Sequence, residues 1–184
     1  RSNALVLDGI SGIAVNLSVA SLAHPEISQF LRRALQDSQV AADKLILEIT
    51  ESAAIQNFDA AEGFIRDMRR FGVRFSLDDF GSGYTSYAHL KRLSVDTLKI
   101  DGSYIRDIDR SSGRSVADRD VAIVRSMADV AHTLGMKVVA EWVESIDLLA
   151  QLVDLGIDFA QGYAIHKPIR LSELVANTPE VSEQ

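Results

Sequence analysis

RFSLDDFGSGYTS, residues 74–86, shows the unit from which the fold is built. A predicted strand over residues 73–78 ends in two adjacent aspartates, Asp78 and Asp79, and a loop with two glycines then leads into a helical pattern. A strand that passes through a tight loop into a helix is one βα unit of a parallel sheet. Because neighbouring carboxylates repel each other, their place at the end of this strand requires an explanation.

The same arrangement recurs along the chain. Short runs rich in β-branched residues predict six strands, over residues 13–17, 45–50, 73–78, 97–101, 137–141 and 159–162. Helical periodicity predicts helices between them, over residues 25–37, 59–71, 84–93, 119–134 and 146–155. The alternation predicts an α/β fold with parallel strands and right-handed crossovers. Most of these strands are apolar on both faces, which predicts a sheet with helices on one side and packed core on the other.

Two architectures satisfy this pattern, an open doubly wound sheet and a closed (β/α)8 barrel of the TIM type. No glycine-rich phosphate fingerprint follows the first strand, which argues against the dinucleotide-binding version of the open sheet. A barrel requires eight strands and typically about 250 residues, whereas the chain has 184 residues. If the fold is a barrel, its N-terminal strand or strands and a helix are therefore expected to be missing from this chain.

Composition excludes several classes of protein. The net charge of −7 argues against a partner such as polymeric nucleic acid, and the absence of cysteine excludes disulfides and thiolate metal sites. No apolar run approaches the roughly 20 residues that span a bilayer, so we expect no membrane contact by this segment and a cytoplasmic location, with membrane anchoring left to a longer parent chain. Residues 1–12 are expected to be a lead-in that includes a tag remnant, 13–176 the partial barrel domain and 177–184 a tail. Residues 109–120 are expected to form a mobile surface loop.

Every predicted strand ends in polar or charged residues. They are Asn16, Glu48 and Glu51, Asp78 and Asp79, Lys99 and Asp101, Glu141 and Glu144, and Gln161. The carboxyl ends of barrel strands open onto one face, so we expect these side chains to converge. A single carboxylate at a strand end is more often a helix cap or a solvated loop residue, but six strand ends out of six favour a common site.

Such a cluster needs cations. It contains seven carboxylates and one lysine, and two unit charges 4 Å apart interact by about 4 kcal/mol at an effective dielectric near 20. Oxygen ligands suit hard divalent ions such as Mg²⁺ or Mn²⁺. Adjacent aspartates can each reach a different ion, as in two-metal phosphoryl chemistry. The sequence therefore predicts a site for two metal ions that activate water.

Six motifs carry a family resemblance. They are VNLS (15–18), LEITES (47–52), DDFGSGYTS (78–86), LKIDGSYI (98–105), VVAEWVES (138–145) and QGYAIHKP (161–168). In this order they resemble the signatures of the EAL domain, a family of bacterial phosphodiesterases that open cyclic di-GMP to linear pGpG. The resemblance implies a modified (β/α)8 barrel with cyclic di-GMP as its small-molecule partner.

The resemblance also implies roles for single residues. The implied metal ligands are Asn16, Glu48, Asp78 and Glu141, with Asp79 serving the second ion. The implied catalytic residues are Lys99, Glu141 and Asp79, and Lys99 would hold the attacking water or a substrate oxygen. The implied substrate-binding residues are Gln161, Asp101, Glu144 and Pro168. Glu51 would anchor the loop after Asp79, and the helix over residues 84–93 would form a homodimer contact.

Two departures from the family pattern qualify this interpretation. Trp142 stands where the family usually has glycine, so a bulky indole either packs outward or narrows the pocket. The glutamate that names the family precedes the asparagine motif, and nothing in residues 1–13 matches it. We therefore expect the isolated chain to hydrolyse cyclic di-GMP poorly or not at all. A receptor that binds cyclic di-GMP without cleaving it is the alternative, and a remnant that only dimerises is the third.

Overall fold

The structure is a computed structural model of the chain, and it describes residues 10–83, 85–109, 118–170 and 173. The predicted tail over residues 177–184, most of the predicted lead-in over 1–12 and most of the predicted loop over 109–120 lie outside these residues. Those three predictions therefore stay predictions.

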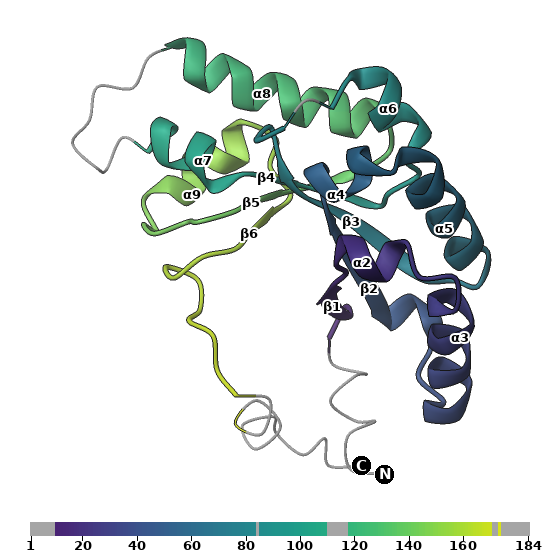
Figure 1. Cartoon of the computed structure of the whole chain (residues 1–184). Helices are drawn as coiled ribbons and strands as arrows, with labels where there is room; N and C mark the ends of the chain where they lie inside the picture. Colours follow the sequence, from purple (N-terminus) through teal and green to yellow (C-terminus); the bar gives the residue numbers. More distant parts are fainter. Residues whose placement is uncertain (1–9, 84, 110–117, 171–172, 174–184) are drawn as a thin grey trace.

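One curled parallel sheet forms the centre of the molecule (Figure 1). Its strands pair in chain order and are β1 (Ile13–Asn16), β2 (Leu45–Thr50), β3 (Arg74–Phe80), β4 (Thr97–Ile100), β5 (Lys137–Ala140) and β6 (Phe159–Ala160). All six predicted strands are confirmed, and so is the α/β fold class with barrel-like curvature. Within the described residues β1 and β6 each pair on one side only, so the sheet is open there.

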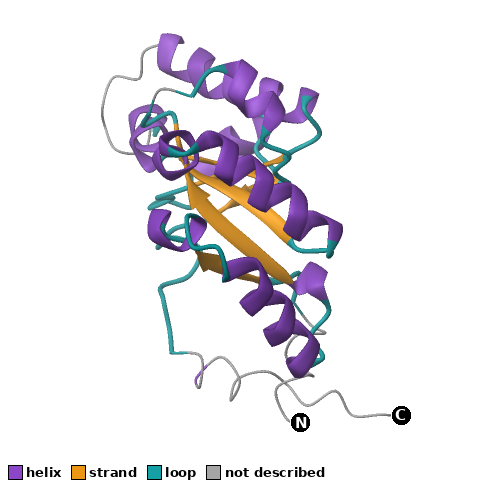
Figure 2. Cartoon of the chain, turned by 45° about the vertical axis from the view of Figure 1, so that its right-hand side comes forward, coloured by secondary structure: helices purple, strands orange, loops and turns teal. Residues whose placement is uncertain are grey.

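Helices line the outer side of the curled sheet, as Figures 1 and 2 show from two directions. They are α2 (Val19–Leu22), α3 (Ile27–Ser38), α4 (Glu51–Gln56), α5 (Phe58–Arg70), α6 (Tyr87–Arg92), α7 (Gly102–Ile108), α8 (Asp118–Thr133) and α9 (Leu148–Asp154), with a 3-10 turn η1 over Ala42–Lys44. The five predicted helices correspond to α3, α5, α6, α8 and α9. The other three are short helices close behind a strand, and the sequence pattern did not predict them.

The core lies between the helices and the outer face of the sheet. Phe75 of β3 is fully buried and packs edge-on against Phe64 of α5, with 5.8 Å between ring centroids. Side chains alternate between the two faces of a strand. Ser76, next to Phe75 on β3, and Lys99, next to Leu98 on β4, therefore face the inner side of the sheet. The candidate site lies on this inner face, at the carboxyl ends of the strands.

The prediction of strands apolar and covered on both faces is wrong for β1. Every residue of β1 is exposed, with 42% of Ile13 and 45% of Val15 accessible to solvent. The physical reason is that only β2 pairs with this strand among the described residues, so its remaining edge is uncovered.

In the part of the chain that the structure describes, no helix combines the length and the apolar character needed to cross a membrane.

Candidate functional site at the ends of the strands

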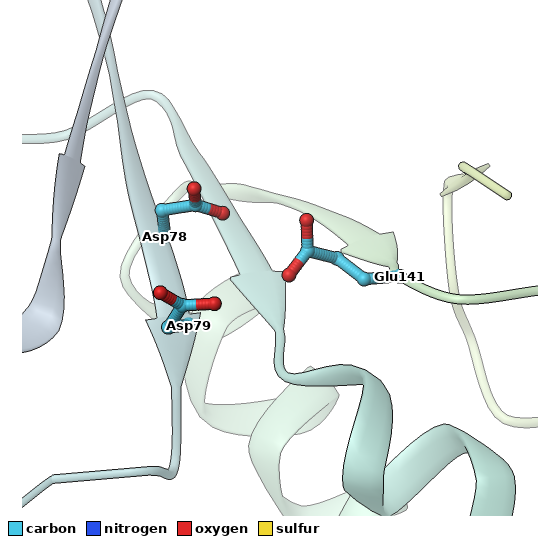
Figure 3. Close-up of side chains that lie close together, drawn as sticks. All are labelled: Asp78, Asp79 and Glu141. Carbon is cyan, nitrogen blue, oxygen red and sulfur yellow. The ribbon is translucent and has the colours of Figure 1, made fainter. Parts of the chain in front are cut away.

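Asp78 and Asp79 lie where β3 loses its regular register with β4. Leu77 pairs with Leu98, but the next pair joins Phe80 to Ile100, so the register shifts between Leu77 and Phe80. Asp79 takes a left-handed conformation with φ of 54°, which aspartate adopts more readily than most residues. In a regular strand adjacent side chains point to opposite faces. Here the irregular backbone lets both carboxylates face the same neighbour, Glu141 (Figure 3).

Three carboxylates meet at this point. Asp78, Asp79 and Glu141 each offer an oxygen within 4.8 Å of the others, which is a spacing that a metal ion can bridge. Asp78 and Asp79 come from β3, whereas Glu141 directly follows β5, so the fold brings together residues that are 63 and 62 positions apart in the chain. The convergence that the sequence predicted is therefore present for these three side chains.

Lys99 lies at the centre of the charge cluster. Its Nζ is 2.7 Å from Oε1 of Glu141, 2.8 Å from Oδ1 of Asp78 and 3.4 Å from Oε1 of Glu48. The lysine side chain is only 5% exposed, and its three partners are exposed by 10–14%. One buried ammonium thus contacts three carboxylates, and Asp79 adds a fourth negative group close by.

The pKa shifts reflect this imbalance. Burial raises the pKa of Asp79, and the charges of Asp78 and Asp101 raise it further. Burial also raises the pKa of Glu141, although the hydrogen bond and charge of Lys99 act in the opposite direction. Burial alone would lower the pKa of Lys99, but its carboxylate partners outweigh this effect and hold the pKa above its ordinary value. The lysine therefore stays charged, and the carboxylates retain an excess of negative charge.

The donor set fits a hard divalent cation. All the available ligand atoms are oxygens, which suit Mg²⁺, Mn²⁺ or Ca²⁺ better than soft metals. Asn16 is the last residue of β1 and pairs in register with Glu48 of β2. Its amide oxygen is therefore available at the carboxyl ends of the strands, next to the carboxylate of Glu48. Asn16 is exposed, in contrast to the half-buried Glu48. Cations would relieve the carboxylate repulsion that Lys99 offsets only in part.

Glu51 holds the loop that follows the two aspartates. This carboxylate is 1% exposed and is the first residue of α4. Its oxygens accept hydrogen bonds from the backbone N–H groups of Gly81 at 2.8 Å, Gly83 at 3.1 Å and Thr85 at 2.7 Å. A side chain at residue 83 would place its Cβ 3.0 Å from the Glu51 carboxylate, so glycine allows the loop to close over this group.

Two further contacts near the site, one from Asp101 and one from Tyr104, were not predicted from the sequence. Asp101 caps α7, because its Oδ1 accepts hydrogen bonds from the N–H of Ser103 at 2.9 Å and from the Ser103 hydroxyl. Tyr104 donates its hydroxyl to the carbonyl of Gly81 at 3.1 Å. Both residues lie in the LKIDGSYI motif, in which roles were predicted for Lys99 and Asp101 but not for Tyr104. The substrate-binding role of Asp101 stays a prediction beside its observed capping role.

The remaining predicted site residues lie near the end of β6. Glu144 and Gln161 border a cavity of about 400 Å³, together with Trp142, Gly162 and Tyr163. Pro168 is exposed in the segment that follows β6. The cavity is thus bordered by two of the four predicted substrate-binding residues.

The chain is similar to known proteins over most of its length. The family model described as EAL domain matches residues 3–168. Cyclic di-GMP phosphodiesterase PdeA of Borreliella burgdorferi is 37% identical over 161 residues, which are 88% of this chain and 23% of that protein. The chain therefore spans less than a quarter of this curated relative.

Solved structures of known proteins also resemble this chain in fold. The PaMucR phosphodiesterase in complex with c-di-GMP is 36% identical with a TM-score of 0.83, and the match covers 95% of this chain and 69% of that one. Klebsiella pneumoniae BlrP1 in a manganese and cyclic di-GMP complex is 30% identical with a TM-score of 0.77, over 89% of this chain and 40% of that one. Its calcium complex gives 31% identity and a TM-score of 0.74, over 89% and 41%.

Proposed function

The chain belongs to the EAL domain family, and on that premise we propose that its acidic cluster hydrolyses cyclic di-GMP to the linear dinucleotide pGpG. The observation that carries this proposal is the meeting of the Asp78, Asp79 and Glu141 carboxylates within 4.8 Å, beside the buried ammonium of Lys99. Relatives named as cyclic di-GMP phosphodiesterases support the substrate. Cytoplasmic cyclic di-GMP would be the pool on which the site acts.

Each residue of the cluster has a chemical task in this proposal. The ligands of two Mg²⁺ or Mn²⁺ ions would be Asn16, Glu48, Asp78, Asp79 and Glu141. When bound, such ions acidify water to hydroxide and polarise phosphoryl oxygens. Lys99 stays protonated in its buried position and stabilises the negative charge that develops on the phosphoryl group. Glu51 keeps the loop after Asp79 in place, so the two aspartates hold their positions.

The proposal has a direct test. Purified chain is incubated with cyclic di-GMP and Mg²⁺ or Mn²⁺, and pGpG is quantified by chromatography. We expect slow turnover by the isolated chain, because Asn16 is exposed on an open edge of the sheet. Asp78→Asn removes a metal-binding oxygen and should lower the rate by about a hundredfold or more. Asp67→Asn, at an exposed carboxylate of α5 that pairs with Arg32, is the matched control and should keep the wild-type rate.

One outcome would contradict the assigned site, and another would favour a different function. Equal rates for Asp78→Asn and wild type would place the chemistry elsewhere. Tight binding of cyclic di-GMP with no turnover at any metal concentration would favour the receptor alternative.

We also propose that the chain forms a homodimer through α6. This helix directly follows the loop that Glu51 holds, and its Tyr87 is 61% exposed. A contact there would connect the partner molecule to the aspartates through one short loop.

A further inference from the structure

Trp142 has an unusual backbone conformation next to the acidic cluster. It directly follows Glu141 and takes a left-handed conformation with φ of 52°. Bulky residues rarely adopt such angles, and they persist where the surrounding structure fixes them. The side chain is nevertheless 57% exposed, so burial of the indole does not account for its position.

Backbone contacts fix residue 142 from both sides. The N–H of Glu141 donates to the carbonyl of Ile100 at 3.3 Å, and the N–H of Val143 donates to the carbonyl of Gln161 at 3.0 Å. Gly162 passes so close that a Cβ there would lie 2.3 Å from the backbone of Val143. Trp142 therefore has a defined place relative to both Glu141 and Gln161.

The indole is also supported by the start of α7. A Cβ at Gly102 would lie 2.1 Å from Cγ of Trp142, so the indole rests against a position where only glycine leaves room. One part of the ring thus contacts the helix, and more than half of the side chain remains open to solvent. A flat apolar surface held in this way is preorganised for contact with another planar group.

The surroundings of the indole indicate which planar group it suits. The cavity of about 400 Å³ is bordered by two exposed aromatic side chains, Trp142 and Tyr163, and by the polar Glu144 and Gln161. Trp142 and Glu144 also border a second cavity of about 260 Å³. Aromatic side chains stack on nucleobases, and polar side chains read the edges of the bases by hydrogen bonds. A carboxylate accepts such bonds from the N–H groups of a purine such as guanine.

We propose that Trp142 is a stacking platform for one purine base of the cyclic dinucleotide and thereby sets the affinity of this chain for its substrate. The proposal rests on the proposed function, in which the acidic cluster binds the phosphates through cations. Because Glu141 and Trp142 are consecutive residues, one rigid segment would contact both the phosphate and the base ends of the ligand.

The chain has a single tryptophan, so its fluorescence reports on residue 142 alone. Cyclic di-GMP is titrated in the presence of Ca²⁺, with fluorescence and calorimetric heat recorded in parallel. We expect quenching by cyclic di-GMP and none by ribose 5-phosphate, which carries no base. Trp142→Gly, whose glycine suits the observed φ, should weaken binding about tenfold, whereas Trp142→Phe should stay close to wild type. Phe30→Ala, at a 64% exposed aromatic side chain of α3, is the matched control and should bind like wild type.

The two proposals fail in different ways. Calorimetric binding with unchanged fluorescence, or equal affinities of Trp142→Gly and wild type, would overturn the stacking platform and leave the ligand assignment standing. Absence of binding heat for the wild type would overturn the proposed function and the platform with it. Gly102→Ala gives an independent check, because the added methyl group displaces the indole while the tryptophan is retained. This variant should weaken cyclic di-GMP binding as Trp142→Gly does. Wild-type affinity of Gly102→Ala would count against the platform.

Discussion

At the scale of single residues, two aspartates show how neighbours decide the charge of a carboxyl group. Asp79 lies among carboxylates, and its pKa is raised by burial and by those charges. Asp158, at the opposite end of the sheet, contacts Nζ of Lys137 at 2.7 Å, Nε2 of His132 at 2.8 Å and the N–H of Val138 at 2.9 Å. Burial alone would raise the pKa of Asp158, but these donors outweigh it and lower the pKa to about 2.

Asp158 therefore links folding stability to pH. A carboxyl group whose pKa is lower in the folded state stabilises that state above its ordinary pKa, and the contribution is lost as the pH falls from about 4 toward 2. Asp158→Asn should lower the free energy of unfolding by about 1 kcal/mol at pH 7. The difference from wild type should shrink below about pH 4, measured by urea unfolding at a series of pH values. Asp147→Asn, at an exposed carboxylate without a capping hydrogen bond, serves as the control, and a difference that is constant with pH would contradict the linkage.

Much of the candidate site was predictable residue by residue, but its contacts were not. Asp78, Asp79 and Glu141 could be named because each lies at the end of an apolar run, and ends of parallel strands meet. The register shift in β3 and the left-handed conformations of Asp79 and Trp142 leave no mark in hydrophobic periodicity. They depend on contacts with distant strands, so only the structure explains why adjacent aspartates face one partner.

At the scale of elements, the strands and five of the helices followed from their periodicity, whereas α2, α4 and α7 did not. α2, α4 and α7 begin within three residues of the end of a strand, so the strand pattern runs directly into them. α6 and α9 are as short as α4 and α7 but begin seven or more residues after a strand, and they were predicted. Their start signals were nevertheless present, because Ser18, Thr50 and Asp101 are N-cap residues whose side chains accept backbone hydrogen bonds. Asp101 was predicted only as a site residue, and Ser18 and Thr50 only as parts of the VNLS and LEITES motifs, so their role in starting helices was not predicted.

The loop between β3 and α6 depends on α4 through one side chain. Glu51 accepts three backbone N–H groups in a buried position, and Glu51→Gln replaces one acceptor oxygen by a donor that faces other donors. Removal of a charged partner from buried N–H groups costs about 3 kcal/mol. We expect this loss in the free energy of unfolding, together with faster hydrogen exchange at Gly81, Gly83 and Thr85. Glu26→Gln, at an exposed glutamate without a capping hydrogen bond, should change neither quantity. Unaltered exchange at the three loop amides in Glu51→Gln would refute the anchoring role.

At the scale of the whole molecule, the open sheet is the feature with the largest consequence. Within the described residues β1 pairs only with β2, and its apolar Ile13 and Val15 are about half exposed. The unpaired N–H and C=O groups of an edge strand are a template for another strand. The surfaces of the described residues that suit a second copy of the chain include the β1 edge and the exposed face of α6.

These two surfaces predict different responses to substitution. If the β1 edge pairs, Val15→Lys puts a charge on that edge and should weaken self-association about tenfold or more, measured by sedimentation over a wide range of protein concentration. Val153→Lys, on α9 where the valine is 70% exposed, adds the same charge elsewhere and should leave the association unchanged. If Val15→Lys associates like wild type and Tyr87→Ala does not, α6 forms the interface and the edge prediction is wrong. Since the proposed metal ligand Asn16 lies on this same edge, pairing at β1 should also raise the rate of cyclic di-GMP hydrolysis with protein concentration, and Val15→Lys should remove that dependence.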